Sequence, residues 1–130
     1  MIELNFRHKI GDKELATAIA QDYETGEVLM VAFINKEAYE KSVKTRKAHY
    51  YSTSRDEVWF KGEISGHIQK IHEIHIDCDR DAVLFKVEQI GGACHTGHYS
   101  CFYTEITDDG ENIKENKNNI VFNPDIVYKE

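Results

Sequence analysis

The chain is organised around the stretch Cys94-His95-Thr96-Gly97-His98-Tyr99-Ser100-Cys101, in which two thiols and two imidazoles fall within eight residues. Packing alone would favour aliphatic residues here, whereas the threonine, glycine and serine supply hydroxyls and a turn. We therefore interpret the stretch as a loop that can close on a metal ion. The third cysteine of the chain lies in a second unusual stretch, Asp77-Cys78-Asp79-Arg80-Asp81, and we expect the two stretches to build one site.

The spacing of the cysteines favours a catalytic metal over a structural one. Cys94 and Cys101 have six residues between them, which is not the short spacing of a zinc finger or ribbon. Together with Cys78 they would give a tetrahedral site of three thiolates and one open position, the arrangement of a catalytic zinc that holds water. The alternative is three buried free thiols, because cysteine is among the most often buried residues.

The acidic stretch partly matches the calcium-binding loop of an EF-hand. Asp77, Asp79 and Asp81 take its first, third and fifth positions, and Glu88 takes the twelfth. However, the sixth position lacks glycine, and the β-branched flanks do not predict helices. On an extended chain the three carboxylates would instead project to one side and Cys78 to the other. This pattern favours a hard cation such as magnesium on the carboxylates, with a solvated acidic turn as the alternative.

The apolar patterns predict an α+β fold that is mainly β, with a mixed or antiparallel folded sheet. Residues 16–23 and 28–34 are apolar runs joined by a short loop containing Gly26, which predicts a β-hairpin whose second arm is buried on both faces. Asn35 can cap one principal helix near residues 36–45. Further strands are expected at 48–53, 58–60, 67–76, 82–89, 102–107 and 120–122, with 67–76 and 82–89 paired as antiparallel neighbours.

Size and charge limit the classes of function. A chain of 130 residues is long enough for one domain with one core. A formal net charge of -7 argues against nonspecific binding to nucleic acid or to an anionic membrane. The longest apolar run, residues 28–34, is far shorter than the roughly 20 residues that span a bilayer. We expect no nucleic-acid or membrane partner, and a cytoplasmic protein with reduced thiols.

Several further blocks of sequence accompany the two cysteine stretches. These blocks are Asp22–Met30, Ser52–Arg55, Trp59–Glu63, Ser65-Gly66 and Phe102. In order and spacing, the whole set resembles the phosphoribosyl-AMP cyclohydrolase family of histidine biosynthesis, over most of residues 16–103. Residues 1–130 would be a single cyclohydrolase domain with a short C-terminal extension from about residue 104. Tyr51 stands where the family usually has Trp, and Ile64 stands where it usually has Thr.

The resemblance implies an intertwined homodimer in which each zinc ion is held by Cys94 and Cys101 of one chain and Cys78 of the other. It also implies magnesium bound by the aspartates of residues 77–81. The implied reaction is the addition of water at C6 of the adenine ring of phosphoribosyl-AMP, with cleavage of the bond from N1. The small-molecule substrate carries two ribose phosphates.

Catalytic and substrate-binding residues are proposed from this chemistry. Three thiolates donate charge to a metal and weaken its effect on bound water, so a nearby base is needed. His95, beside Cys94, is the first choice and His98 the second. The alternative for His95 is a histidine that is hydrogen-bonded to hold the loop. Cations would meet the phosphates, and an indole would stack on the purine. The substrate-binding residues expected are Arg55, Lys61, Glu63 and Trp59.

Two other classes of function compete with this assignment. A noncatalytic, metal-stabilised dimeric binding protein of the same fold is the main alternative, and the retained Ser54, Arg55, Lys61 and Glu63 argue against it. A zinc nucleobase deaminase would carry a His-x-Glu and a Pro-Cys-x-x-Cys motif, which this sequence lacks.

Overall fold

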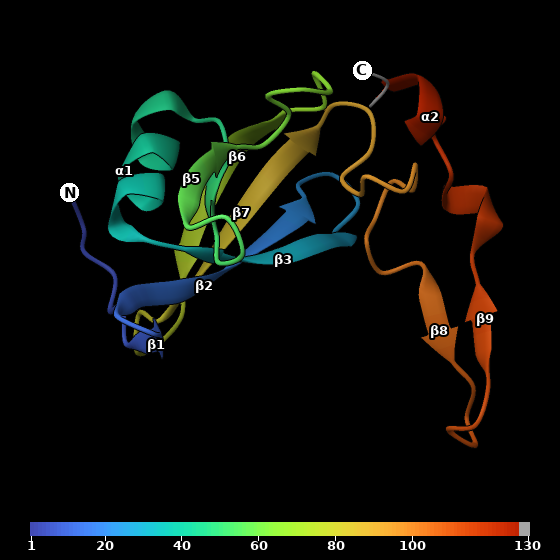
Figure 1. Ribbon diagram of the computed structural model, residues 1–130, viewed down its shortest axis with the longest axis horizontal. Helices are drawn as coiled ribbons and strands as arrows, with labels where there is room; N and C mark the ends of the chain where they lie inside the picture. Colours follow the sequence, from blue (N-terminus) through green and yellow to red (C-terminus); the bar gives the residue numbers. More distant parts are fainter. Residues whose placement is uncertain (128–130) are drawn as a thin grey trace.

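A curled mixed sheet with one principal helix beside it forms the body of the protein (Figure 1). The computed structural model describes residues 1–127, Asn118 by its backbone only. The predicted α+β, mainly β class is confirmed. The elements are β1 (His8–Ile10), β2 (Lys13–Asp22), β3 (Val28–Ile34), α1 (Lys36–Thr45), β4 (His49–Ser52), β5 (Glu57–Phe60), β6 (Gln69–Ile76), β7 (Ala82–Gln89), β8 (Thr104–Ile106), β9 (Ile113–Glu115), the 3-10 turn η1 (Lys117–Asn119) and α2 (Pro124–Val127).

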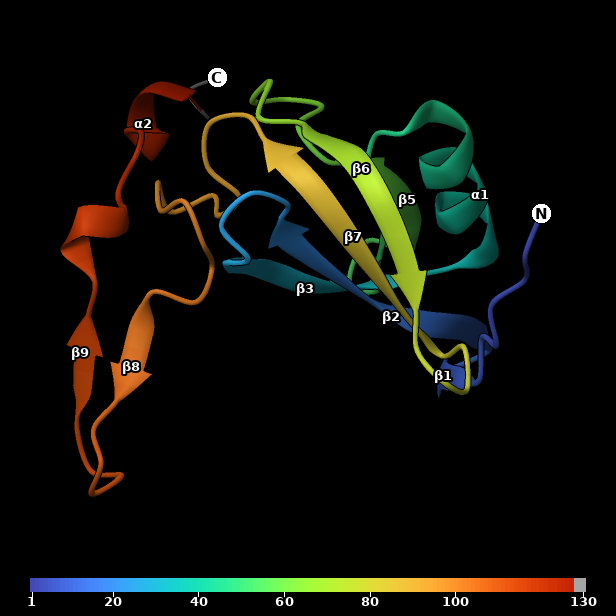
Figure 2. The same ribbon diagram turned by 180° about the vertical axis from the view of Figure 1, so that it is seen from behind.

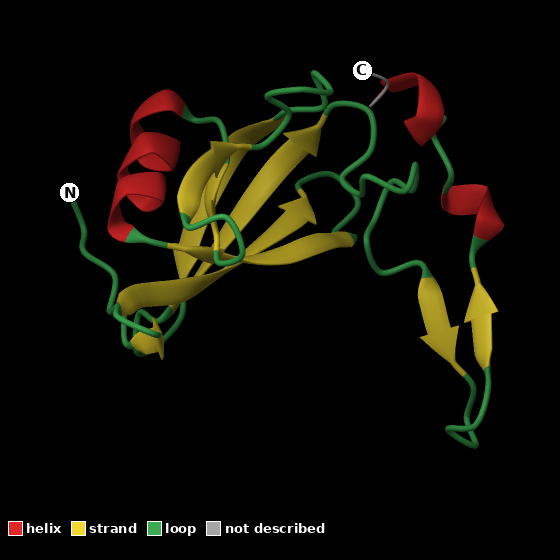
Figure 3. Cartoon of the chain, viewed as in Figure 1, coloured by secondary structure: helices red, strands yellow, loops and turns green. Residues whose placement is uncertain are grey.

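The main sheet has the strand order β5-β4-β3-β2-β7-β6, with β1 paired to the start of β2 (Figure 3). The predicted β2–β3 hairpin is confirmed, and so is the antiparallel β6–β7 pair. The sheet is mixed because β2 pairs with β7 in parallel, from Thr17 opposite Ala82 to Asp22 opposite Val87. This parallel pair lies at the centre of the sheet and connects both halves of the chain.

Helix α1 begins and ends where its caps dictate. The Asn35 side chain accepts a hydrogen bond of 2.9 Å from the Ala38 N–H, which satisfies one of the free amides of the first turn. Arg46 closes the helix in the left-handed region, with φ 58°, and its N–H bonds the Ser42 carbonyl. Ala38, Tyr39 and Ser42 are buried, and the helix predicted near residues 36–45 is confirmed.

A chain of buried amides connects the core to the loop before β6. The Tyr50 hydroxyl donates to Gln69 Oε1 at 2.6 Å, and Gln69 Nε2 donates to Gln89 Oε1 at 2.9 Å. Gln89 Nε2 in turn donates to the carbonyls of Ile90 and His67. Buried polar groups need such partners. This series of hydrogen bonds therefore fixes the backbone that follows the loop between Gly62 and Gly66.

Within residues 1–127, no segment covers one face of the sheet. Figure 2 shows β2, β6 and β7 from the side opposite α1, with no helix lying across them. Val31 of β3 is 50% exposed, so the prediction that residues 28–34 are buried on both faces is wrong for the single chain. The physical reason is that α1 covers only one side. Ile19 and Leu84 line a shallow apolar hollow on the open side.

The C-terminal residues form an arm, which is made of β8 and β9, and a return segment, residues 116–124. Strands β8 and β9 pair with each other, apart from the main sheet, and project from the body in Figure 1. The strand predicted at 102–107 is therefore present but shorter. The edge strand predicted at 120–122 is wrong, because Ile120 makes only an isolated bridge to His98. Within residues 1–127, no helix combines the length and the apolar character needed to cross a membrane.

Candidate functional site

Residues 94–101, the cysteine loop, bring two thiols together. Cys94 is buried, and its thiol interacts with that of Cys101. Burial and then the neighbouring Cys94 thiol raise the pKa of Cys101 to about 12, while Lys61 acts in the opposite direction. A thiol in this setting stays protonated at neutral pH unless a cation joins it. The pair is therefore suited to a metal ion, which would favour both thiolates.

Backbone and hydroxyl groups hold the cysteine loop against the β2–β3 hairpin. The Cys101 N–H donates to the Leu29 carbonyl at 2.7 Å. The Ser100 hydroxyl donates to the Val28 carbonyl at 2.7 Å. The Tyr99 hydroxyl donates to Asp22 at 2.5 Å. These three bonds fix the residues around Cys101 on the first residues of β3 and on the last residue of β2.

Inside the loop, one hydroxyl joins a thiol to an imidazole. Thr96 Oγ1 donates to Cys94 Sγ at 3.0 Å and lies 3.0 Å from His98 Nδ1. One hydroxyl group therefore connects the thiol of Cys94 to the imidazole of His98. His98 is buried and stacks on Tyr103 at 3.5 Å between ring centroids. His95, by contrast, is exposed beside Cys94.

The four expected substrate-binding residues line one hollow. Arg55, Trp59, Lys61 and Glu63 surround a volume of about 120 Å³. Lys61 is only 5% exposed, and burial lowers its pKa, while the nearby Cys101 and Cys94 oppose that change. Lys61 therefore belongs to both the hollow and the thiol pair.

This hollow is too small for a nucleotide by itself. Ligand pockets usually measure about 300 to 1,000 Å³. Larger hollows of about 320 Å³ and 360 Å³ lie under the N-terminal segment and at the base of the β8–β9 arm, but no cysteine lines either one. We therefore place the site at the smaller hollow, where the chemically distinctive groups are.

Tyr51 and Ile64, the two departures from the family pattern, lie in different environments. Tyr51 is buried, and its hydroxyl donates to Asp56, which raises the pKa of Tyr51 to about 12. The aromatic ring is thus kept as part of the core. Ile64 is 78% exposed on the rim of the hollow, in a loop otherwise rich in polar residues.

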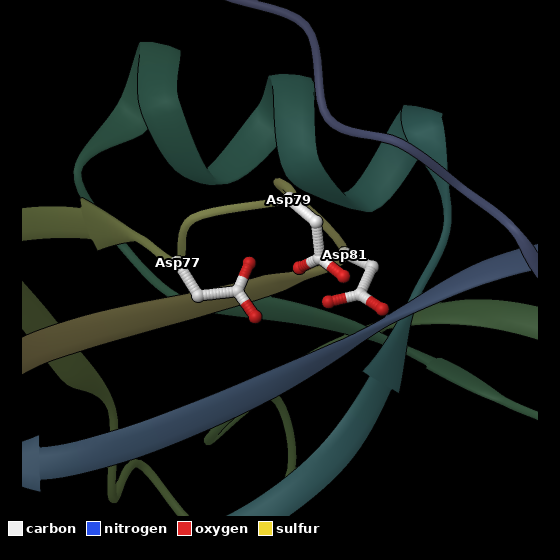
Figure 4. A group of neighbouring side chains, drawn as sticks. All are labelled: Asp77, Asp79 and Asp81. Atoms are coloured by element: carbon white, nitrogen blue, oxygen red, sulfur yellow. The ribbon is translucent and has the colours of Figure 1, made fainter.

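The three carboxylates of the acidic stretch converge (Figure 4). Asp77, Asp79 and Asp81 each offer an oxygen, and these oxygens lie within 4.8 Å of one another. The expected meeting of the three is confirmed, but the extended backbone that predicted it is wrong. The segment is a tight turn in which Arg80 takes φ 61° and Asp77 Oδ1 accepts from the Ala82 N–H at 3.1 Å.

Arg7 is a member of this acidic cluster that sequence reasoning missed. Its Nε lies 2.5 Å from Asp81 Oδ2, and its Nη2 lies 3.7 Å from Asp79. His8 Nε2 lies 3.3 Å from the same Asp81 oxygen. Hydrogen bonding from Arg7 lowers the pKa of Asp81 to about 2, whereas hydrogen bonding with Asp81 raises the pKa of Asp79. Arg7 is 74 residues from Asp81 in the sequence, and no local motif indicates the contact.

The third cysteine lies far from the other two in the same chain. Cys78 is exposed in the turn before β7, whereas Cys94 and Cys101 follow the other end of that strand. An eight-residue strand spans about 26 Å. Within the described part of the chain, the aspartate triad is accordingly the only group of three or more metal-ligand side chains that meet.

Comparison with known proteins now gives the family. A family model described as phosphoribosyl-AMP cyclohydrolase matches residues 30–103. The phosphoribosyl-AMP cyclohydrolase of Methanosphaera stadtmanae is 64% identical over 99% of both chains. The chain belongs to the phosphoribosyl-AMP cyclohydrolase family. Membership of this family places it among hydrolases, and the family model covers β3 through the cysteine loop and stops before the arm.

Other relatives of the cyclohydrolase family also include the C-terminal residues. The phosphoribosyl-AMP cyclohydrolase of Methanothermobacter thermautotrophicus is 54% identical over 98% of this chain and 91% of its own length. A histidine biosynthesis bifunctional protein of Thermoanaerobacter pseudethanolicus is 53% identical over 93% of this chain and 55% of its own length. The arm and return segment are therefore part of what this chain shares with its relatives.

Replacing Tyr99 by Phe tests the attachment of the cysteine loop. Loss of the hydrogen bond to the Asp22 carboxylate should lower the free energy of unfolding by about 1 kcal/mol at pH 7, after solvent screening. Burial raises the pKa of Asp22, but the bonds from Tyr99 and from the amides of Glu24 and Thr25 lower it below its ordinary value overall.

The effect of Tyr99→Phe should depend on pH. A lowered carboxylate pKa gives stability that is present above the unfolded value of about 4 and is lost as the pH falls through the folded value. Urea unfolding at pH 7 and at acidic pH measures both, with Tyr103→Phe as a control that also removes a tyrosine hydroxyl. Equal losses at both pH values would contradict the Asp22 linkage.

Proposed function

We propose that this chain hydrolyses the N1–C6 bond of the adenine ring of phosphoribosyl-AMP, in a zinc- and magnesium-dependent step of histidine biosynthesis. The observation that carries the proposal is the paired Cys94 and Cys101 thiols, which share Lys61 with the hollow formed by residues 55–65. Family membership supplies the reaction, and this arrangement supplies groups able to perform it.

The reaction consumes one molecule of water. The water oxygen bonds to C6 and the C6–N1 bond breaks, while one proton of the water goes to N1 and the other to the exocyclic nitrogen on C6. C6 stays bonded to the imidazole ring as a carboxamide, and N1 stays attached to its ribose in the formimino product. The chain must therefore hold the ring, expose C6 to water, and move the protons of that water.

The chemistry of the donor set fits zinc. Thiolates are preferred zinc ligands, and three of them with one open position match a catalytic rather than a closed structural site. Cys94 and Cys101 of one chain and Cys78 of a second chain would hold the ion. When bound, zinc supplies Lewis acidity, which lowers the pKa of water from 15.7 toward about 7.

The remaining groups of the site have separate roles in this proposal. His95 is exposed next to Cys94 and is the group that moves the proton. His98 is buried between Thr96 and Tyr103, and it orients the loop. Arg55 carries a guanidinium that is more than half exposed and can meet a phosphate, while Trp59 offers a ring to the purine.

The acidic turn is the proposed magnesium site. Three carboxylate oxygens near one another suit a hard cation that prefers oxygen ligands and keeps several waters. Asp77 and Asp79 are exposed, whereas Asp81 is engaged by Arg7. A cation that binds here must therefore share Asp81 with Arg7 or displace the guanidinium.

A homodimer would complete the site and cover the open face of the sheet. Cys78 lies too far from Cys94 in one chain, so a second copy must supply it. The hollow at Lys61 is smaller than a nucleotide needs, and Val31, Ile19 and Leu84 form an apolar surface with no covering layer. A cytoplasmic setting, which keeps thiols reduced, suits three free cysteines.

Mixing two inactive variants tests the shared site. Cys78→Ser and Cys101→Ser should each abolish ring opening and zinc binding. A heterodimer of the two has one intact site, built from Cys94 and Cys101 of the first variant and Cys78 of the second. After unfolding and refolding together, activity and zinc per chain should recover to about one quarter of the unmodified protein, because about half of the pairs are heterodimers.

The controls for this mixing experiment are each variant refolded alone and both refolded separately before mixing. No recovery from variants that fold and dimerise would contradict the shared site. Zinc without ring opening in the unmodified protein would instead favour the noncatalytic, metal-stabilised dimer.

Replacing Arg7 by Gln tests the magnesium site. Removal of a competing cation should tighten magnesium binding by up to about fivefold, the size expected for an exposed charge pair. Titration calorimetry with magnesium alone measures this, and Lys9→Gln serves as a control that removes a nearby positive charge outside the cluster. Weaker binding in Arg7→Gln would show that Arg7 organises the carboxylates instead of competing for them.

A further inference from the structure

The return segment, residues 116–124, lies directly against the cysteine loop. The N–H groups of Val121 and Phe122 both point to the Gly97 carbonyl, at 2.7 Å and 3.3 Å. Gly97 has φ 99°, and a Cβ at this position would come within 2.5 Å of the Phe122 carbonyl oxygen. The glycine is therefore required by both its backbone conformation and the close approach of the return segment.

Asn119 makes the most specific contacts between the two segments. Its backbone carbonyl accepts from the Tyr99 N–H at 2.6 Å. Its side-chain Oδ1 accepts from the Ser100 N–H at 2.9 Å. Its Nδ2 donates to Glu27 Oε2 at 3.3 Å, at the end of the β2–β3 turn. One asparagine thus joins the cysteine loop, the return segment and the β2–β3 hairpin.

These contacts fall on the two residues that precede Cys101. Their amides are held by Asn119, while the Cys101 N–H is held by Leu29. Three consecutive N–H groups are therefore fixed from two sides. Because the backbone fixes the position of Cβ and restricts the side-chain rotamers, this fixation limits where the Cys101 sulfur can lie relative to Cys94.

We propose that Asn119 is a positioning residue of the metal centre, which holds the backbone of Tyr99 and Ser100 so that the Cys101 thiol faces Cys94. The proposal rests on the proposed function, in which these two thiols bind zinc. It assigns a role to the C-terminal extension, since residues beyond 103 lie outside the part of the chain matched by the family model.

Asn119 would act as partners behind a metal ligand commonly do. Groups that orient ligands are worth roughly tenfold to a hundredfold in metal affinity when they are removed. Asn119→Ala keeps the backbone carbonyl but loses the bonds to Ser100 and Glu27. We expect zinc affinity to fall about tenfold.

The experiment uses the full-length protein loaded with zinc or with cobalt(II). Withdrawal of zinc by a chromogenic chelator gives the affinity, and the visible sulfur-to-cobalt absorption reports the geometry of the thiolates. Amide hydrogen exchange at Tyr99 and Ser100 should quicken in Asn119→Ala. The matched control is Asn112→Ala at the tip of the arm, where the backbone makes the bonds to Thr107.

A double variant in which donor and acceptor are exchanged separates the positioning of the cysteine loop from the general stability of the protein. Asn119→Asp keeps the acceptor for Ser100 but places a carboxylate against Glu27, so it should also weaken zinc binding. Adding Glu27→Gln restores a donor opposite that acceptor, and zinc affinity and the cobalt spectrum should return toward those of the unmodified protein. If Asn119→Ala does not fold, this pair decides the question.

Different results would contradict the proposed function and the role of Asn119. Unmodified protein that shows no sulfur-to-cobalt absorption would overturn the proposed function, and the role of Asn119 with it. A normal spectrum in the unmodified protein, with the same affinity and spectrum in Asn119→Ala and Asn119→Asp, would overturn only the role of Asn119.

Discussion

The parallel pairing of β2 with β7 is the constraint on which the rest of the structure depends. Its register sets Thr17 beside Ala82 and Asp22 beside Val87. One end of the pair therefore carries the acidic turn, against the β1 segment that brings Arg7. The other end carries the cysteine loop, against the β2–β3 hairpin. A slip of the register would separate each group of side chains from its partners.

The same pairing places the acidic turn and the cysteine loop, the two proposed metal-binding stretches, at opposite ends of β7. β7 is eight residues long, and the chain cannot bring Cys78 back to Cys94 across that distance. The zinc site implied for the family is therefore incomplete in a single chain. The open sheet face and the small hollow at Lys61 also favour a dimer, because a second copy would cover each of them. The proposed association and the proposed chemistry would thus both follow from the pairing of β2 with β7.

Local patterns in the sequence predicted those features that depend on neighbouring residues. The hairpin around Gly26, the helix capped by Asn35 and the β6–β7 pair all follow from period and turn chemistry. Contacts between distant segments could not be predicted in this way. The contacts of Arg7 with Asp81 and of Asn119 with Ser100 join segments that are far apart in the sequence. No local period or turn motif indicates such contacts. The turn at Arg80 was missed because alternating aspartates suggest an extended strand, although the carboxylates converge in either case.

We infer that three thiolates drawn from two chains form one zinc centre. Zinc X-ray absorption on the purified protein tests this inference, because the method counts the sulfur atoms bound to the metal. Three sulfurs at about 2.3 Å and one lighter atom are expected. A shell with two sulfurs or fewer would leave Cys78 outside the centre and would contradict the shared site.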